Sequence, residues 1–390
     1  MRPSDLPLDP PICSHDRFFI HSSALAVDAF RLLGNSGVMT TTDDLVPLKV
    51  SGPEGLLAAV PTMLGFHPRD SLVLLCLTGP RRRVGPVARV DLPPGRDRAL
   101  ANQLTDHARR YADEVVLISY QTSRRRPPFL DDLLGRLAAA GIDVMDAIVV
   151  RDGRARPALS RAMERTHPGI PVPDASDPQV RALAAAGALA GRKVLADRQE
   201  LRGSIAGPRG DRRRMAQAGI DAAAAGHLPR PGDPQTARDA HESGAGSIPA
   251  EVHALVEHAL DQTAETGMLE VDVATALAVI VNDVLIRDAL IARAVVEMQR
   301  PWLPMLIACA GWTPDAQAPH LCSVLAVTAY RHGDGALAQV AVDRCLAAEP
   351  QHRLAHLLLA IMAAGLHPDE LIHLACGDET GDESDCDAVP

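Results

Sequence analysis

The chain has 390 residues and a net charge of −10, with 47% hydrophobic and 23% charged residues. This length predicts two or three domains, each able to bury a core, and the composition is ordinary for a globular protein. The negative charge argues against generic nucleic-acid binding, which needs a cationic face. No apolar run approaches the about 18 residues of a membrane span, so we expect neither nucleic acid nor membrane as a partner.

Seven cysteines are scattered along the chain without a CxxC pair. Their number is odd, and several lie inside apolar runs, where a free cysteine behaves as a small hydrophobic residue. This usage is typical of a reducing cytosol rather than of a disulfide scaffold, so we expect a cytoplasmic protein.

The pattern near the start of the chain is the most explicit. A short strand is expected at 46–50, and a capping box of Ser51 and Glu54 then begins a helix over 53–63. Residues 72–77 are apolar on both faces and predict an interior strand. The next strand, 84–92, alternates: one face carries Val84, Ala88, Val90 and Leu92, and the other carries Val87, Arg89 and Asp91.

Strands and helices continue to alternate after this pair. Helices are predicted at 97–111 and 127–140, and strands at 115–120 and 144–150, the latter ending in a hairpin turn at Asp152-Gly153. This alternation predicts an α/β fold with a mixed, mainly parallel sheet that has helices on both faces.

Composition shifts suggest a domain organisation. We expect a disordered N-terminal extension, with a native start at Met39; a short helix over 23–33 is the alternative for that segment. A Pro-rich connection is expected at 153–177. The expected units are 1–38 (extension), 39–165 (α/β domain), 166–225 (helical connection), 226–248 (linker), 249–376 (helical domain) and 377–390 (acidic disordered tail).

The helical domain contains one pair of segments, 321–330 and 336–347, whose small residues fall where a tetratricopeptide-type repeat places them. Residues 353–364 could cap this pair. Such arrays need about three repeats for stability, so a generic helical hairpin remains the alternative. The other predicted helices are 178–190, 197–206, 209–225, 251–266, 271–280 and 283–297.

Two motifs resemble a known family. The run Gly-Phe-His-Pro-x-Asp-Ser-Leu-Val at 65–73 and the strand Gly-Pro-Val-Ala-Arg-Val-Asp-Leu-Pro at 85–93 are similar to an actinobacterial family of domains of unknown function (domain of unknown function 4192). The resemblance runs from Met39 to about Cys376. It implies a fold and a lineage but no mechanism. Many family members carry tryptophans and a cysteine-rich turn where this chain has Arg-Ala-Arg-Pro at 154–157, so a metal or thiol role there would not transfer.

Common catalytic signatures are absent: the sequence has no Walker A run, GxGxxG, GxSxG or HExxH motif. His352 and His356 stand four apart, and His253, Glu257 and His258 form a similar group. Both sets are interpreted as surface helix positions, because zinc needs three or four convergent ligands. We therefore expect no metal and no cofactor. Asp283, Arg287 and Asp288 are interpreted as an interhelical or interdomain salt bridge.

The best candidates for chemistry lie around one loop. His67, Asp70 and Ser71 could do acid–base or nucleophilic work, and Arg89 and Asp91 could face the same pocket. The competing interpretation is structural, with capped loop backbone and an ion pair.

A second candidate site is the helix start at Ser51, Gly52 and Glu54. Its free N–H groups could hold an anion, and open α/β sheets bind ligands beyond the carboxyl ends of their parallel strands.

Two functions remain open on the sequence. The leading hypothesis is a non-catalytic protein-interaction or regulatory module that binds a protein partner through its C-terminal helices. The alternative is an enzyme or sensor that binds a small anionic ligand, a nucleotide or phosphate ester, at the α/β domain. The oligomeric state does not follow from the sequence.

Overall fold

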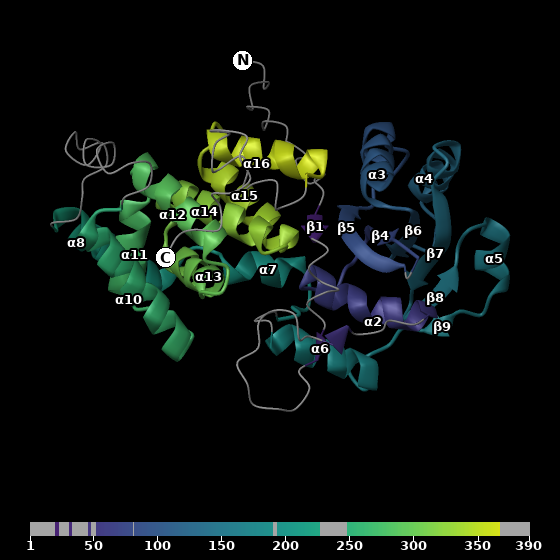
Figure 1. Ribbon diagram of the computed structural model, residues 1–390, viewed down its shortest axis with the longest axis horizontal. Coiled ribbons are helices and arrows are strands. Elements are labelled where there is room, and N and C mark those ends of the chain that lie inside the picture. The colour runs from purple at the N-terminus through teal and green to yellow at the C-terminus, as the bar shows by residue number, and fades with distance from the viewer. Residues whose placement is uncertain are drawn as a thin grey trace, which may run out of the picture.

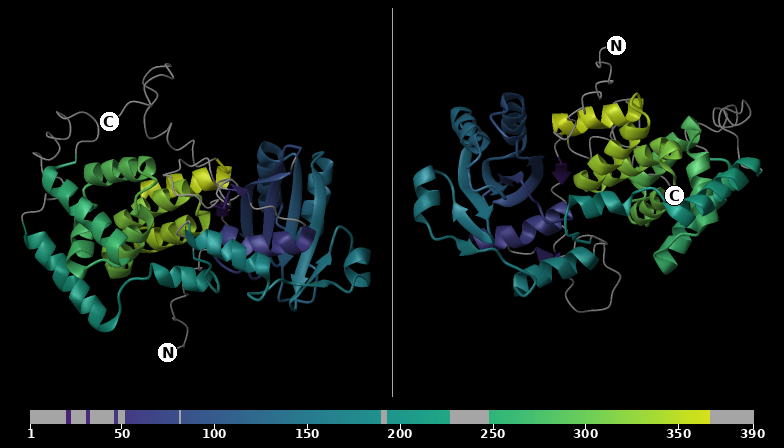
Figure 2. Two further views of the ribbon diagram at one scale, coloured as in Figure 1. Left: turned by 60° about the horizontal axis from the view of Figure 1, so that its bottom comes forward. Right: turned by 180° about the vertical axis from the view of Figure 1, so that it is seen from behind.

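A computed structural model describes residues 20–22, 31–32, 46–47, 52–80, 82–189, 193–226 and 248–366. A sheet half and a helical half lie side by side, with α7 between them (Figure 1), and two further views show the same division (Figure 2). The strands are β1 Ile20–Ser22, β2 Arg31–Leu32, β3 Val46–Pro47, β4 Ser71–Thr78, β5 Arg83–Asp91, β6 Glu114–Tyr120, β7 Asp143–Arg151, β8 Arg154–Pro157 and β9 Ile170–Pro171. The helices of the first half are α2 Gly52–Leu64, α3 Arg98–Tyr111, α4 Pro128–Ala139, α5 Arg161–Thr166 and α6 Pro178–Leu189.

The main sheet has the strand order β1-β5-β4-β6-β7-β8-β9. The predicted mixed sheet is confirmed, and the segments around Val73, Val116 and Val149 lie on adjacent strands. The expected predominance of parallel pairing is wrong: β6 and β7 pair in parallel, and the other described pairs are antiparallel. The reason is that β4 lies between β5 and β6. The helix α3 therefore joins two strands that run in the same direction without being neighbours, and only α4 makes a crossover between adjacent strands.

Helices cover both faces of the sheet, as predicted, because successive side chains of β4 point to opposite sides. Leu72 and Leu74 pack in one core with α3 and α4. Val73 and Leu75 pack in the other core with α2. A strand that is apolar on both faces is thereby buried on both.

A bulge changes one predicted face of β5. Leu75 pairs with Val87 and Leu77 with Val84, so β5 has an extra residue opposite Cys76. Val84 and Val87 consequently lie in the same core, whereas simple alternation predicts opposite faces.

The segment after β7 holds more structure than the expected Pro-rich connection. The two-residue turn at Asp152 (φ 51°) and Gly153 (φ 68°) joins β7 to β8 as predicted, and both positive φ angles suit a type I′ hairpin. The chain then adds α5 and β9 to this side of the sheet. These elements are too short to show a period in the sequence.

The beginning of the chain contributes two short pieces. β1 pairs with the free edge of β5, and β2 pairs with β3 in a separate two-stranded sheet. The described part of the strand predicted at 46–50, Val46–Pro47, therefore pairs outside the main sheet. The rest of the expected extension, most of the alternative helix at 23–33, the linker at 227–247 and the tail lie outside the described residues.

The helical half is built around α14 and α15, which pack along each other as the predicted pair. Every residue from Leu321 to Tyr330 on α14 is buried, because α12, α13, α15 and α16 surround this helix. The pair is thus the centre of the helical half and offers little open surface. The helices here are α7 Arg198–Ser204, α8 Gly210–Ala225, α10 Ala250–Thr266, α11 Val271–Ile280, α12 Val284–Val296, α13 Trp302–Trp312, α14 Ala318–Arg331, α15 Gly335–Ala348 and α16 Arg353–Ala364.

Within the ranges given above, no helix combines the length and the apolar character needed to cross a membrane.

The central position of Leu74 gives a first prediction. Leu74→Ala should lower the free energy of unfolding by about 2–5 kcal/mol, because it leaves a cavity between β4 and the helices α3 and α4. Leu357→Ala on α16 is the matched control: its side chain is 57% exposed, and the change should stay within about 0.5 kcal/mol. Urea unfolding followed by circular dichroism measures both. Equal losses in the two variants would contradict the described core.

Candidate functional site

Three of the predicted site residues meet in the sheet. Ser71 and Asp91 are cross-strand partners on β4 and β5, and Arg89 lies two residues before Asp91. Arg89 donates to Ser71 Oγ from Nε at 3.0 Å and from Nη2 at 2.6 Å, and it forms an ion pair with Asp91. Its guanidinium also lies 5.9 Å from the ring centroid of Phe66. The prediction that Arg89 and Asp91 lie on one face of the strand agrees with their ion pair.

The surroundings of Arg89 suit a structural role. Arg89 is 4% exposed and Ser71 is fully buried, and the Ser71 hydroxyl donates to the Arg69 carbonyl. Burial lowers the pKa of Arg89, and the negative charge of Asp91 counteracts this. A serine that accepts from a guanidinium and donates to a carbonyl has no base to activate it as a nucleophile.

The other two loop candidates lie apart from this group. The side chain of His67 is exposed, and its backbone N–H donates to the Leu195 carbonyl at 3.2 Å. Asp70 accepts from the backbone N–H and the hydroxyl of Thr122, both at 2.8 Å. Asp70 thus ties the loop to the end of β6. The five candidates do not converge on one cavity.

The ion pair at Arg89 continues into the helical half. Arg198 on α7 lies 3.5 Å from Asp91 through Nη1 and 3.4 Å from Asp343 of α15 through Nη2. Arg202 also reaches Asp343, at 3.7 Å. The chain Arg89–Asp91–Arg198–Asp343 therefore joins β5 to α15 across α7. We call it the junction network.

A pocket of about 240 Å³ lies at the other candidate site, the start of α2. Gly52 begins α2 with φ 71°, and the Glu54 carboxylate folds back close to it. Ser51, and with it the predicted capping box, lies outside the described residues. The pocket is lined by Pro53, Glu54, Asp146, Ile148, Ala155, Arg156, Pro157, His167 and Ile170.

The polar groups of the pocket were largely missed on the sequence. Burial raises the pKa of Asp146, a carboxylate in the middle of β7. The sequence did contain one signal for this pocket: Asp146 is an acidic residue inside the apolar run 144–150. Arg156 and His167 come from β8 and the loop after α5, and only the hairpin between β7 and β8 brings them beside Asp146. His167 Nδ1 accepts from the Gly169 N–H at 2.9 Å.

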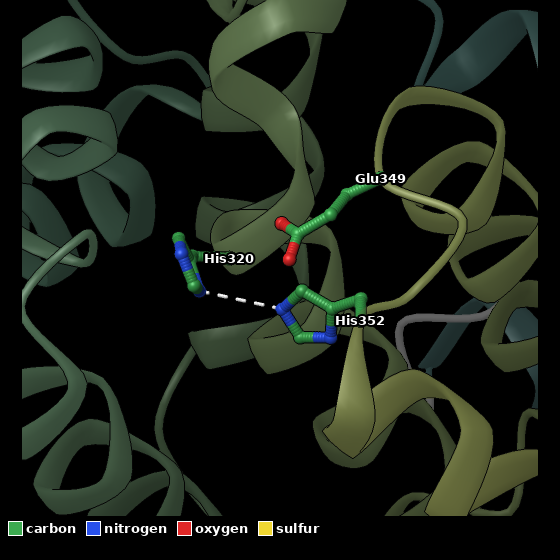
Figure 3. A group of neighbouring side chains, drawn as sticks. All are labelled: His320, Glu349 and His352. Atoms are coloured by element: carbon green, nitrogen blue, oxygen red, sulfur yellow. Dashed lines mark hydrogen bonds between the residues drawn. The ribbon is translucent and has the colours of Figure 1, made fainter.

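A second polar group lies in the helical half. His320, Glu349 and His352 each offer one potential ligand atom, and these atoms lie within 4.8 Å of one another. Figure 3 shows the two rings and the carboxylate directed at a common point. His352 Nε2 is 3.3 Å from His320 Nδ1. Burial lowers the pKa of both rings, and Arg287 adds to the effect at His320.

Two interpretations of histidines as surface positions need comment. His352 is 2% exposed and caps the start of α16, so its surface assignment is wrong: α14 and α15 cover it. His356 is exposed, and its Nε2 contacts the Pro350 carbonyl at 2.8 Å instead of facing His352.

Asp283 caps α12, and Arg287 pairs with Asp288 and contacts His320 Nδ1.

The group around His253 is an ion-pair cluster. Glu257 binds Arg293 of α12 and, at 2.8 Å, Arg300, whereas His253 lies 3.8 Å away. The hydrogen bond from Arg300 lowers the pKa of Glu257 to about 2, and Arg293 adds to the effect. The cluster joins α10 to α12.

These observations define an α/β protein with a helical half that shares its hydrophobic core and is joined to it by partly buried ion pairs. The family described as "Domain of unknown function (DUF4192)" has a model that matches residues 53–369, and the chain belongs to this family. The match runs from the first turn of α2 to just beyond α16, so both halves are part of the family's domain. Comparison with curated proteins and with solved structures found no match.

The junction network gives a second prediction. Arg89→Met should lower the free energy of unfolding by about 1–3 kcal/mol, because Ser71 Oγ loses its charged hydrogen-bond donor and Asp91 keeps only its ion pair with Arg198. Arg83→Met, at the exposed start of the same strand, should change it by less than about 0.5 kcal/mol. Chemical denaturation measures both. A stable Arg89→Met protein would show that the guanidinium is dispensable for folding.

Glu257 gives a third, pH-dependent prediction. Its folded pKa is about 2 and its ordinary value is 4.5, so its stabilising effect is complete above pH 5 and disappears as the pH falls towards 2. Glu257→Gln should therefore be less stable than the wild type by roughly 1–2 kcal/mol at pH 7, and the difference should vanish near pH 2. Glu265→Gln, exposed on the same helix, is the control. Urea unfolding at several pH values tests this; a difference that does not depend on pH contradicts it.

Proposed function

We propose that this protein is a non-catalytic regulatory module that binds a small amine-bearing or zwitterionic molecule in the pocket beside α2. The observation that carries the proposal is the pocket itself: a cavity of about 240 Å³ with apolar walls and a few charged groups. This combination is typical of small-ligand sites, although the volume lies below the range for drug-sized molecules. A compact ligand fits it best.

The charges of the pocket favour an ammonium group over a phosphate. Glu54 and Asp146 supply two carboxylates, against the single guanidinium of Arg156. A phosphate ester at the start of α2 would face both carboxylates, which weakens the hypothesis of an anionic ligand. An ammonium beside Asp146 would restore the charge that burial disfavours there. Arg156 could at the same time pair with a carboxylate of the same ligand, as an amino acid would require.

The non-catalytic assignment is supported by the hydrogen bonds and ion pairs that the acid–base candidates make with other residues. Ser71, Arg89 and Asp91 are occupied with one another, and Asp70 is occupied with Thr122. The described part of the chain offers no nucleophile paired with a base at the pocket. A regulatory role is favoured by the junction network, which gives the sheet half a direct connection to the helical half.

A protein partner at the C-terminal helices is the second candidate. The exposed side chains of Val284 and Leu285 on α12 and Leu357 on α16 favour it. The buried pair α14 and α15 does not serve as such a surface, so docking would use the outer helices. A cytoplasmic location is supported by the free, buried thiols, whose pKa burial raises: Cys76, Cys309, Cys322 and Cys345.

The ligand is tested by thermal unfolding of the full chain with amino acids, small amines and phosphate esters. A ligand present at 100 times its Kd stabilises a protein by about 2.7 kcal/mol, which for a chain of this length corresponds to a rise in Tm of about 3 °C. We expect such a rise with a zwitterion or amine. Asp146→Asn and Arg156→Gln should abolish it.

Asp143→Asn is the matched control, because Asp143 is exposed on the same strand outside the pocket. It should keep the full response. A rise with phosphate esters alone would instead support the anionic alternative. No rise with any class, or a rise that survives both pocket variants, would refute the proposal.

A further inference from the structure

We propose that His320, Glu349 and His352 form a binding site for a divalent transition-metal ion such as Zn²⁺. This site is independent of the pocket beside α2, since all three residues belong to the helical half. Two imidazoles and one carboxylate are a ligand set that zinc uses in proteins when a fourth position is left to water or another ligand.

The spacing of the nitrogens carries the proposal. His320 Nδ1 and His352 Nε2 are 3.3 Å apart. Two ligands bound tetrahedrally at 2.0–2.1 Å from one zinc ion lie about 3.3–3.4 Å from each other. The Glu349 oxygen lies within 4.8 Å of the ligand atoms of both rings, and it would move closer to them to bind the same ion. Figure 3 shows the carboxylate directed towards the gap between the rings.

The backbone holds the three ligands close to their positions. His320 lies in the first turn of α14, Glu349 is the C-terminal cap of α15, and His352 is the N-terminal cap of α16. These helices pack on one another in the buried centre of the helical half. A metal ion here would therefore tie three helix ends together without a large rearrangement.

Burial favours the neutral imidazole, which is the form that binds metals. No hydrogen bond joins Glu349 to either ring, although all three residues are within the described helices and turns. The carboxylate is thus directed at the histidines without a direct contact that would explain its position.

The 3.3 Å between the rings is also spanned by a hydrogen bond from His352 Nε2 to His320 Nδ1, which a metal ion would replace. Two further contacts compete with the metal. Arg287 Nη1 lies 3.3 Å from His320 Nδ1, so the guanidinium occupies the lone pair that a metal needs. Arg287 is also paired with Asp288, which can hold it when it moves away. The second competitor is the Ala355 N–H, which lies 3.3 Å from His352 Nδ1 and thereby places the ring proton on Nε2. Metal binding moves that proton and breaks the cap. Removal of Arg287 should accordingly tighten binding.

The experiment is calorimetric titration of the chelator-treated full chain with ZnCl₂, together with the visible spectrum of the Co²⁺-loaded protein. We expect one equivalent bound with a Kd of about 10 µM or tighter, and the intense Co²⁺ bands of a four-coordinate site. His320→Gln and Glu349→Gln should each weaken binding by about tenfold or more. Arg287→Gln, which keeps all three ligands, should strengthen it.

His356→Ala is the matched control, because this histidine is exposed and lies one turn from His352 on the same helix. Its affinity should equal that of the wild type. Each variant is first melted without metal to check its fold. If a ligand variant fails to fold, the Zn²⁺ affinity of Arg287→Gln becomes the deciding measurement. An affinity of Arg287→Gln no tighter than that of the wild type overturns the proposal. Absence of binding, or binding unchanged in His320→Gln and Glu349→Gln, also overturns it.

Discussion

The buried guanidinium of Arg89 is the constraint on which the pairing of β4 with β5 and the junction network depend. A charge inside a sheet is costly unless it is paired and hydrogen-bonded. Ser71 and Asp91 meet this need only in the observed register of β4 and β5. Asp91 also forms an ion pair with Arg198, and Arg198 forms a second ion pair with Asp343 in the helical half. One buried charge thus matches a strand register and is linked to α7, which also packs into the core through Leu201 and Ile205.

This constraint explains why the residues of the most suggestive motif of the sequence do not gather around one cavity. The side chains of Ser71, Arg89 and Asp91 are held by one another, and Asp70 is held by Thr122. The groups with unused chemistry lie elsewhere, in the pocket beside α2 and between the rings of His320 and His352. Each of these sites combines residues from elements that are distant along the chain, so neither produces a local motif.

The sequence predicted most elements because their periods are clear. Helices α11 and α16 have the predicted bounds, and β4, β5, β6 and β7 lie within two residues of them. No prediction from the sequence covered the helix α13, for two reasons. The helix is apolar on all sides and therefore has no amphipathic pattern, and it contains Pro304, which lowers the helix propensity. The histidine–glutamate cluster was missed for a different reason: Glu349 and His352 are 29 or more residues away from His320, and only the packing of α14 against α15 and α16 brings them together.

The sequence by itself determined most of the segments that become strands and helices, and that Arg89 and Asp91 share a face. Periodicity carries this information because it depends on neighbours along the chain. The tertiary structure alone decided that β4 lies between β5 and β6, that a bulge turns Val84 to the other core, and that α14 and α15 become the centre of the helical half. These outcomes depend on contacts between distant segments, whose energies a local pattern does not contain.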